Sequence, residues 1–206
     1  MIKSPFIVEQ DLLSPLLCED IVDLLAFGIP DVDKDDNPLK TIRHNESIEE
    51  VVYERFDEMI PIIESHYDIK YKGMDKMQFE FYPQGFLGEE AHSENSNFYR
   101  GKWIRTKDFD FVAIIWLSTY SESTAGLGEF DIYGGKLEFP QYDFSFNPEQ
   151  GTMVIFPAVP NFINAISPVE VNNLYQIRIK ITADKPYLHD PKKFPGSYIE
   201  WFESFA

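Results

Sequence analysis

The stretch from 151 to 178, GTMVIFPAVPNFINAISPVEVNNLYQIR, predicts two strands joined by a turn. Residues 152–156 form a short apolar run that Pro157 closes, which is typical of a buried strand. Residues 174–181 alternate apolar and polar side chains, so the two kinds fall on opposite faces of a second strand. The segment between them, NFINAISP at 161–168, holds the residue on which the functional question turns.

The composition is that of one folded, acidic domain. A chain of 206 residues can bury a full core, and its 44% apolar and 16% aromatic residues argue against disorder. Eighteen basic residues against thirty-five acidic ones give a formal net charge of −17, which argues against nucleic acid and anionic membranes as partners. The charge is compatible with a basic protein partner, an oligomer, metal sites or a plain solvated surface.

The use of cysteine and the N-terminal sequence indicate a compartment. Cys18 is the only cysteine, so the chain has neither an intrachain disulfide nor a thiolate cluster for zinc, which favours a reducing environment. Residues 1–15 lack the apolar core of a signal peptide, and no stretch approaches the ~20 apolar residues of a membrane span. We therefore expect a cytoplasmic protein.

The first part of the chain, about 12–66, predicts two helices. Ser14 is a good N-cap and Pro15 suits the first helical position. Ser47, with Glu50 three residues later, predicts a capping box at the start of the second helix, and Pro61 predicts a kink or a further short helix. The apolar stripe expected on the first helix comprises Leu17, Ile21, Leu24 and Leu25.

The part from about 69 to 183 predicts many short strands. The run 109–117, FDFVAIIWL, is strongly apolar and predicts a central buried strand, whereas 88–102 is polar and carries the first candidate site, and 118–135 is expected to be a loop. Helices followed by strands predict an α+β, mostly β domain, with the helices packed against a β-sandwich or a barrel-like roll. Residues 184–206 form a proline-rich, then aromatic tail.

His92 and Glu94 are the first candidate for chemistry. Alternate residues of an extended segment point the same way, so the imidazole and the carboxylate can bind one ion. A non-haem iron site needs a second histidine besides such a pair. Alone, the pair is a weak signal, since a surface histidine beside an acid is common. Trp103, Arg105 and Lys107 are expected in a loop at the mouth of this site.

An ordered series of short motifs surrounds this pair. It comprises Leu13-Ser14-Pro15 with Cys18, Tyr82-Pro83-Gln84-Gly85, His92 with Glu94, the run 111–117, Gly134-Gly135-Lys136-Leu137-Glu138-Phe139-Pro140, and Gly151 to Pro157. In this order the motifs resemble the iron(II)/2-oxoglutarate-dependent dioxygenases, especially the prolyl-4-hydroxylase-like branch, over roughly residues 6–183. The resemblance implies a double-stranded β-helix, two facing sheets closed like a jelly roll, with iron(II) and 2-oxoglutarate as cofactors.

The sequence departs from that family at the residues that hold the cofactors. The resemblance places Asn164 where the second iron histidine belongs, and a neutral amide oxygen is the weaker ligand. Glu94 stands where aspartate is usual, and Leu174 where a basic residue grips 2-oxoglutarate. Arg178 faces the same side as Leu174 about 13 Å further along, at ~3.3 Å per residue, where it would reach the cosubstrate or cap the sheet edge. Tyr82 would bind an acid or lie in the core.

Two functions follow from this comparison. The first is an oxygenase fold that has lost catalysis and serves a structural or protein-interaction role, favoured because both cofactors lose an anchor. The style of the sequence resembles oxygenase-like proteins of large tailed bacteriophages, which implies a role in a phage particle or its assembly, in the host cytoplasm or virion. The alternative is an active dioxygenase, with iron held by His92, Glu94 and Asn164 and 2-oxoglutarate held by Arg178 and Tyr82.

Overall fold

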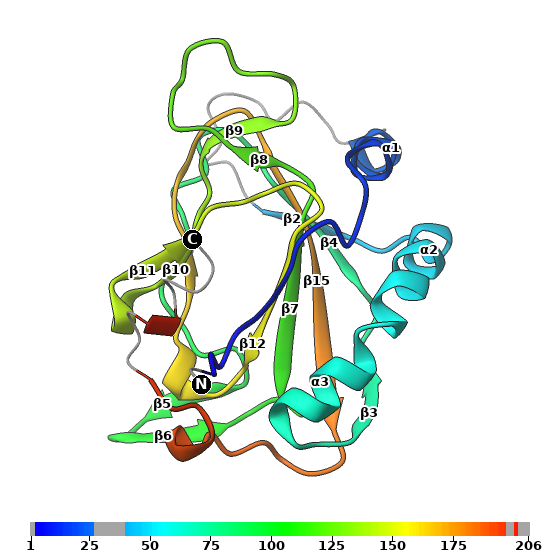
Figure 1. Ribbon diagram of the computed structural model, residues 1–206. Helices are drawn as coiled ribbons and strands as arrows, with labels where there is room; N and C mark the ends of the chain where they lie inside the picture. The colour runs from blue at the N-terminus through cyan, green and yellow to red at the C-terminus, as the bar shows by residue number, and fades with distance from the viewer. Residues whose placement is uncertain (1–2, 27–39, 197–199, 202–206) are drawn as a thin grey trace.

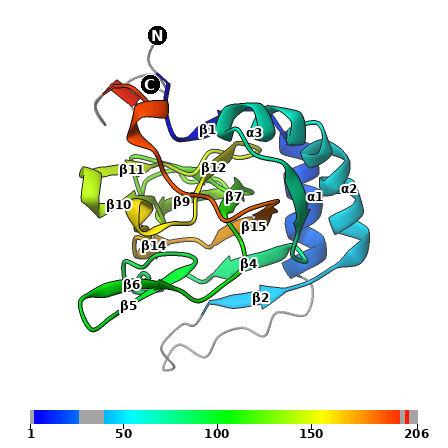
Figure 2. The ribbon, with the colours of Figure 1, turned by 90° about the horizontal axis from the view of Figure 1, so that it is seen from below.

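The computed structural model describes residues 3–26, 40–196 and 200–201. Two facing layers of strands enclose the core, and three helices lie along the outer face of the larger layer (Figures 1 and 2). This is the jelly-roll arrangement that the sequence predicted. Much of the predicted aromatic end of the tail, at 197–199 and 202–206, lies outside the described residues.

The larger sheet contains both strands of the 151–178 stretch. Its order is β1-β12-β7-β15-β4-β2, with β3 paired to β15, and all its pairs are antiparallel. The two strands of the stretch, β12 and β15, are not neighbours, because β7 lies between them. The strand bounds are β1 Ile7–Glu9, β2 Thr41–Arg43, β3 Tyr71–Met74, β4 Gln78–Tyr82, β7 Phe111–Trp116, β12 Met153–Pro157 and β15 Leu174–Ala183.

The facing layer consists of shorter pieces. Its strands pair in the orders β11-β10-β13 and β14-β9-β8, and a separate hairpin is formed by β5 and β6. The bounds are β5 Ser96–Tyr99, β6 Lys102–Arg105, β8 Thr119–Tyr120, β9 Asp131–Gly134, β10 Leu137–Phe139, β11 Phe144–Phe146, β13 Ala165–Ile166 and β14 Val169–Val171. The prediction of a loop over 118–135 was therefore wrong in part, because that range contains β8 and β9.

Aromatic rings fill the space between the layers. Phe6 packs edge-on against Phe139 and Phe162, with ring centroids 4.9 and 5.6 Å apart, and Phe139 packs against Phe156 at 5.1 Å. All four rings are buried, so each contributes about 1.5–3 kcal/mol of hydrophobic stabilisation relative to an exposed ring. Two short 3-10 turns, Pro140–Tyr142 and Pro160–Phe162, connect strands, and a third, Pro191–Lys193, follows β15 in the tail.

The helices are α1 Pro15–Ala26, α2 Glu46–Asp57 and α3 Ile60–Tyr67. Ser14 caps α1 as predicted, with its hydroxyl accepting from the Leu17 amide at 3.3 Å. The cap of α2 is Asn45 rather than Ser47, because its side-chain oxygen accepts from the amide of Ile48 at 3.2 Å. Pro61 lies in the first turn of α3, which confirms the second of the two expectations for it. Within the described ranges, no helix has the length and apolar character needed to cross a bilayer.

One predicted core residue lies outside the core. Leu24 of α1 is 63% exposed, although it fell on the predicted apolar stripe, whereas Cys18, Ile21 and Leu25 are buried. The helix buries a narrower stripe than the sequence suggested, since it lies at one end of the sheet (Figure 1).

Candidate functional site

The structure brings two of the predicted metal ligands together. His92 and Asn164 form an isolated antiparallel bridge, in which each backbone amide donates to the carbonyl of the other at 2.9 and 3.0 Å. Directly opposed residues of an antiparallel pair present their side chains on the same face. The bridge therefore places the His92 imidazole beside the side chain that stands where the resemblance expects a second histidine.

Glu94 completes the predicted group of three. Its carboxylate lies 3.8 Å from Nε2 of His92. Nδ1 of His92 is 2.9 Å from the carbonyl of Glu90 and donates to it, because a carbonyl can only accept. The proton on Nδ1 leaves the lone pair of Nε2 directed into the site. The amide of Asn164 donates to the Phe162 carbonyl at 3.4 Å, and no described residue donates to its buried Oδ1.

The carboxylate of Glu94 is already paired with the guanidinium group of Arg178. Nη1 of Arg178 donates to Glu94, and Nε of the same side chain donates to both oxygens of Glu80 at 3.1 Å. All three residues are buried. Arg178 thus forms the cationic centre between two buried carboxylates.

Further polar groups extend this centre toward the surface. Nζ of Lys40 lies 2.6 Å from Glu80 and 3.0 Å from Glu89. The Gln176 amide donates to Glu80 at 2.7 Å. The Tyr82 hydroxyl lies 3.0 Å from Glu80 and 3.2 Å from Glu89, so it can donate to either. We call eight of these residues the polar cluster: Lys40, Glu80, Tyr82, Glu89, His92, Glu94, Gln176 and Arg178.

The strand register explains why these groups meet. On β15 the residues Leu174, Gln176 and Arg178 share one face, and Gln176 lies opposite Glu80 of β4 in the register. Leu174 lies opposite Tyr82, two residues away on the same face of β4. The other face carries Phe111 of β7, whose ring packs 4.3 Å from that of Tyr67 in α3, so it faces the helices. The cluster therefore lies on the inner face of the larger sheet.

The charges of the cluster keep Glu80 and Glu94 ionised. Burial opposes the ionisation of Glu80, but Arg178 and Lys40 outweigh it and lower the pKa of Glu80 to about 2. The same balance of burial against the charge of Arg178 lowers the pKa of Glu94. Burial, reinforced by the charge of Glu80, raises the pKa of Tyr82 well above its usual value, so its hydroxyl remains a donor.

The predicted cosubstrate anchors have other partners. Arg178 lies on β15, between β7 and β4, so the expectation that it caps the sheet edge was wrong. Its guanidinium donates to two glutamates, and the Tyr82 hydroxyl donates to one of the two glutamates beside it, Glu80 or Glu89. Leu174 is fully buried and offers no charge. To bind the carboxylate of 2-oxoglutarate through two hydrogen bonds, the site needs a cationic side chain that is not already paired. Leu174 has no charge, and Arg178 is already paired with two glutamates.

These residues do not fit iron(II) and 2-oxoglutarate. A facial iron site needs two imidazoles and a carboxylate that are free to bind the metal. Here one imidazole is replaced by the amide of Asn164, and Glu94 is bound to Arg178. A divalent cation within ~4 Å of the guanidinium would meet a repulsion of about 8 kcal/mol at an effective dielectric constant of about 20. Over the parts of the chain that the structure describes, no three acidic, histidine or cysteine side chains form a metal-binding group.

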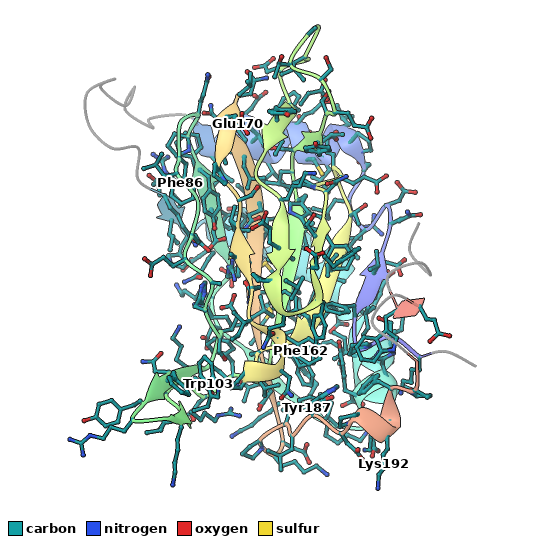
Figure 3. All side chains as sticks on the ribbon, turned by 90° about the vertical axis from the view of Figure 1, so that its left-hand side faces the viewer. Phe86, Trp103, Phe162, Glu170, Tyr187 and Lys192 are labelled. Atoms are coloured by element: carbon teal, nitrogen blue, oxygen red, sulfur yellow. The ribbon has the colours of Figure 1, made fainter. Side chains whose placement is uncertain are left out.

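Sequence reasoning missed half of the cluster. Lys40, Glu80, Glu89 and Gln176 were not candidates, although Glu80 and Gln176 each sit at an inward position of an alternating strand. Polar residues at the inward positions of two strands are the signal that could have found them. Trp103, expected at the mouth of the site, lies instead on β6 in a hairpin that projects from the body of the molecule (Figure 3).

Comparison with solved structures places the fold in a known class. A viral collagen prolyl hydroxylase from Paramecium Bursaria Chlorella virus-1, in complex with 2-oxoglutarate, aligns with a TM-score of 0.64 and 17% identity, covering 87% of this chain and 96% of that one. A prolyl-4-hydroxylase from Pseudomonas putida aligns with a TM-score of 0.61 and 12% identity, covering 88% and 94%. No protein-family model and no curated protein sequence matches the chain.

A third structure shows the same similarity. The prolyl hydroxylase of Trichoplax adhaerens, in complex with a peptide fragment of the oxygen degradation domain of hypoxia inducible factor, aligns with a TM-score of 0.59 and 14% identity, covering 92% of this chain and 86% of that one. The fold is therefore that of the prolyl-4-hydroxylase-like iron(II)/2-oxoglutarate oxygenases, as the motifs predicted. At these identities the similarity shows the fold, and function rests on the side chains described above.

Proposed function

We propose that this protein uses an oxygenase fold without iron- and 2-oxoglutarate-dependent catalysis, as a structural or protein-interaction module. The observation that carries the proposal is the position of Arg178 between Glu80 and Glu94. The guanidinium of Arg178 supplies the positive charge that the buried carboxylates of Glu80 and Glu94 need. The charge of these carboxylates is therefore balanced by a side chain of the protein rather than by a metal ion.

The energetics favour this reading over a weakened iron site. Taking Arg178 away from Glu94 to free a metal ligand would leave a buried cation with one partner fewer, which costs several kcal/mol. Loss of an outer partner of a metal ligand weakens metal binding by about 10–100-fold, and the loss of a ligand itself should cost more. Before iron could bind, Arg178 would have to release Glu94, and the amide of Asn164 would have to serve in place of an imidazole ligand.

We further propose that the protein acts in a phage particle or in its assembly, where its acidic surface contacts other proteins. This proposal rests on the resemblance of the sequence to oxygenase-like proteins of large tailed bacteriophages. The −17 net charge supports a protein rather than a nucleic acid as the partner. The oxygenase fold provides a rigid scaffold of two packed sheets for such contacts.

The alternative, an active dioxygenase, is favoured by one observation. His92 keeps the tautomer that a metal ligand needs, since Nδ1 donates to the Glu90 carbonyl and Nε2 faces Glu94. An iron site on His92, Glu94 and Asn164 would require Arg178 to move away from Glu94.

A turnover assay separates the two functions. The wild-type protein, supplied with iron(II), ascorbate, oxygen and 2-oxoglutarate, is expected to form no succinate above the rate without protein. The viral collagen prolyl hydroxylase serves as the positive control, and His92→Ala as the matched variant. Succinate formation by the wild type that His92→Ala removes would overturn the proposal and establish the dioxygenase.

A further inference from the structure

The β5–β6 hairpin presents an unusual surface for so acidic a protein. Over 96–107, SNFYRGKWIRTK, the sequence has four basic residues and no acidic one, while the whole chain has almost twice as many acidic as basic residues. Four large apolar side chains of the hairpin are 41–62% exposed: Phe98, Tyr99, Trp103 and Ile104. Clustered exposed aromatic and basic side chains are typical of an interaction surface rather than of plain solvated surface.

The hairpin is built to hold this surface in one shape. Arg100 and Gly101 both have positive φ, 49° and 79°, as a two-residue turn of type I′ requires. Phe98 and Trp103 face each other across the strands, with ring centroids 5.2 Å apart. At the base, Arg105 forms an ion pair with the buried carboxylate of Asp110 at 2.7 Å. A pre-ordered hairpin loses little conformational entropy when it binds a partner.

A complementary surface lies beside α2. A groove of about 380 Å³ runs beside α2 and is lined by Glu46, Glu49, Glu50, Tyr53, Met74 and Lys76. Three carboxylates against one lysine, which pairs with Glu46 at 3.3 Å, leave it acidic, and Tyr53 and Met74 provide apolar surface. The groove thus offers the charge and the apolar contacts that the hairpin lacks within its own chain.

The two surfaces cannot meet within one molecule. Figures 1 and 2 show the β5–β6 hairpin and α2 on opposite sides of the sheets in both views. Contact between them therefore needs two copies, and each copy would still have one hairpin or one groove free. Such head-to-tail contacts generate rings or open filaments, which suits a structural role. The net repulsion of two acidic chains is largely screened beyond about 8 Å at physiological salt, whereas ion pairs in direct contact are screened less.

We propose that the β5–β6 hairpin of one copy docks into the acidic groove beside α2 of a second copy, so that the protein self-associates head to tail. This inference deepens the interaction role proposed above and rests on it. Arg100 and Lys102 pair with Glu46 and Glu50 of the second copy, and the aromatic side chains of the hairpin pack on Tyr53 and Met74. The contact is small, so we expect micromolar rather than nanomolar affinity.

Sedimentation velocity over micromolar to millimolar protein tests the interface. The wild type is expected to associate as concentration rises, and Trp103→Ala to weaken association about tenfold or more, as loss of a central aromatic does. A hairpin variant, Arg100→Glu with Lys102→Glu, and a groove variant, Glu46→Lys with Glu50→Lys, are each expected to remain monomeric. Lys192→Glu, on a separate surface (Figure 3), and Leu87→Ala, at an exposed leucine, are controls that should associate like the wild type.

Mixing the two variants gives the decisive result. The hairpin variant keeps an intact groove and the groove variant an intact hairpin, so together they should form a dimer that cannot grow further. A wild type that stays monomeric throughout, or variants that fail to combine while melting like the wild type, would overturn the interface. The buffer contains neither iron nor 2-oxoglutarate, so either result is independent of the turnover assay.

Discussion

Replacing Arg178 by methionine is expected to lower the free energy of unfolding by about 3–5 kcal/mol, because it leaves two buried carboxylates without their shared cation. Glu80 would keep Lys40, but Glu94 would lose its hydrogen bond from Arg178, and the unprotonated Nε2 of His92 at 3.8 Å cannot replace it. Chemical denaturation at neutral pH measures the loss, since both acids of the wild type have lowered pKa values and their ion pairs with Arg178 are fully formed there. An effect of this size would make Arg178 one of the most sensitive positions in the chain.

Three further variants identify the cause of the loss. Arg178→Lys keeps the charge but lacks the planar fork that donates from Nε to Glu80 and from Nη1 to Glu94, so an intermediate loss is expected. Adding Glu94→Gln to Arg178→Met should recover part of the stability, because the unpaired charge is then removed; the cycle measures the coupling. Arg55→Met, at an exposed arginine, should change stability by no more than about 0.5 kcal/mol. A loss below about 1 kcal/mol in Arg178→Met would contradict a buried ion-pair centre.

The second large effect is expected at Gly151. Its φ is +81°, and a Cβ added there would lie 2.1 Å from the backbone carbonyl oxygen of Leu13. Left-handed backbone costs an alanine about 1–2 kcal/mol, and overpacking costs about 1–3 kcal/mol. Gly151→Ala should therefore lower the free energy of unfolding by about 2–5 kcal/mol. The contact joins the start of the 151–178 stretch to the segment that enters α1, where the Leu13 amide donates to the Gly151 carbonyl at 3.2 Å.

Gly101 provides the matched control for this prediction. Its φ of +79° is nearly the same, but no atom lies within 4 Å of an added Cβ. Gly101→Ala should lower the free energy of unfolding only by the cost of left-handed backbone, about 1–2 kcal/mol. Alanine also reduces the conformational entropy of the unfolded chain, but this stabilising effect is the same in both variants. If the two substitutions destabilise equally, the close approach of Leu13 to Gly151 contributes nothing and the account of this motif fails.

Gly151 and Arg178 show what the sequence could and could not predict. The glycine motifs helped to predict the fold, because a backbone position that has no room for a Cβ requires glycine, and a glycine is visible in the sequence. The alternation over 174–181 and the apolar run at 111–117 likewise predicted β15 and β7, since burial follows from residue type. The cap of α2 was misplaced because Asn45 and Ser47 are both good caps, and only the backbone decides between them.

The ion-pair centre could not be derived in the same way. Glu80 and Arg178 lie 98 residues apart, and their meeting depends on the register of β15 against β4. A slip of one residue would move either side chain to the other face, so no local pattern specifies the pair. The sequence did show that Asn164 and Leu174 depart from the family. It did not show that Arg178 binds the carboxylate that iron would need.

An anaerobic titration of the wild-type protein with iron(II) and 2-oxoglutarate tests this central claim most directly. The chelate of iron with 2-oxoglutarate absorbs visible light when both are bound in such a site, and the viral collagen prolyl hydroxylase provides the positive control. Because Arg178 holds Glu94 and Asn164 replaces a histidine, we expect no saturable band and no rise in melting temperature. A saturable band that disappears in His92→Ala would contradict the account, since it would show that iron displaces the guanidinium from Glu94.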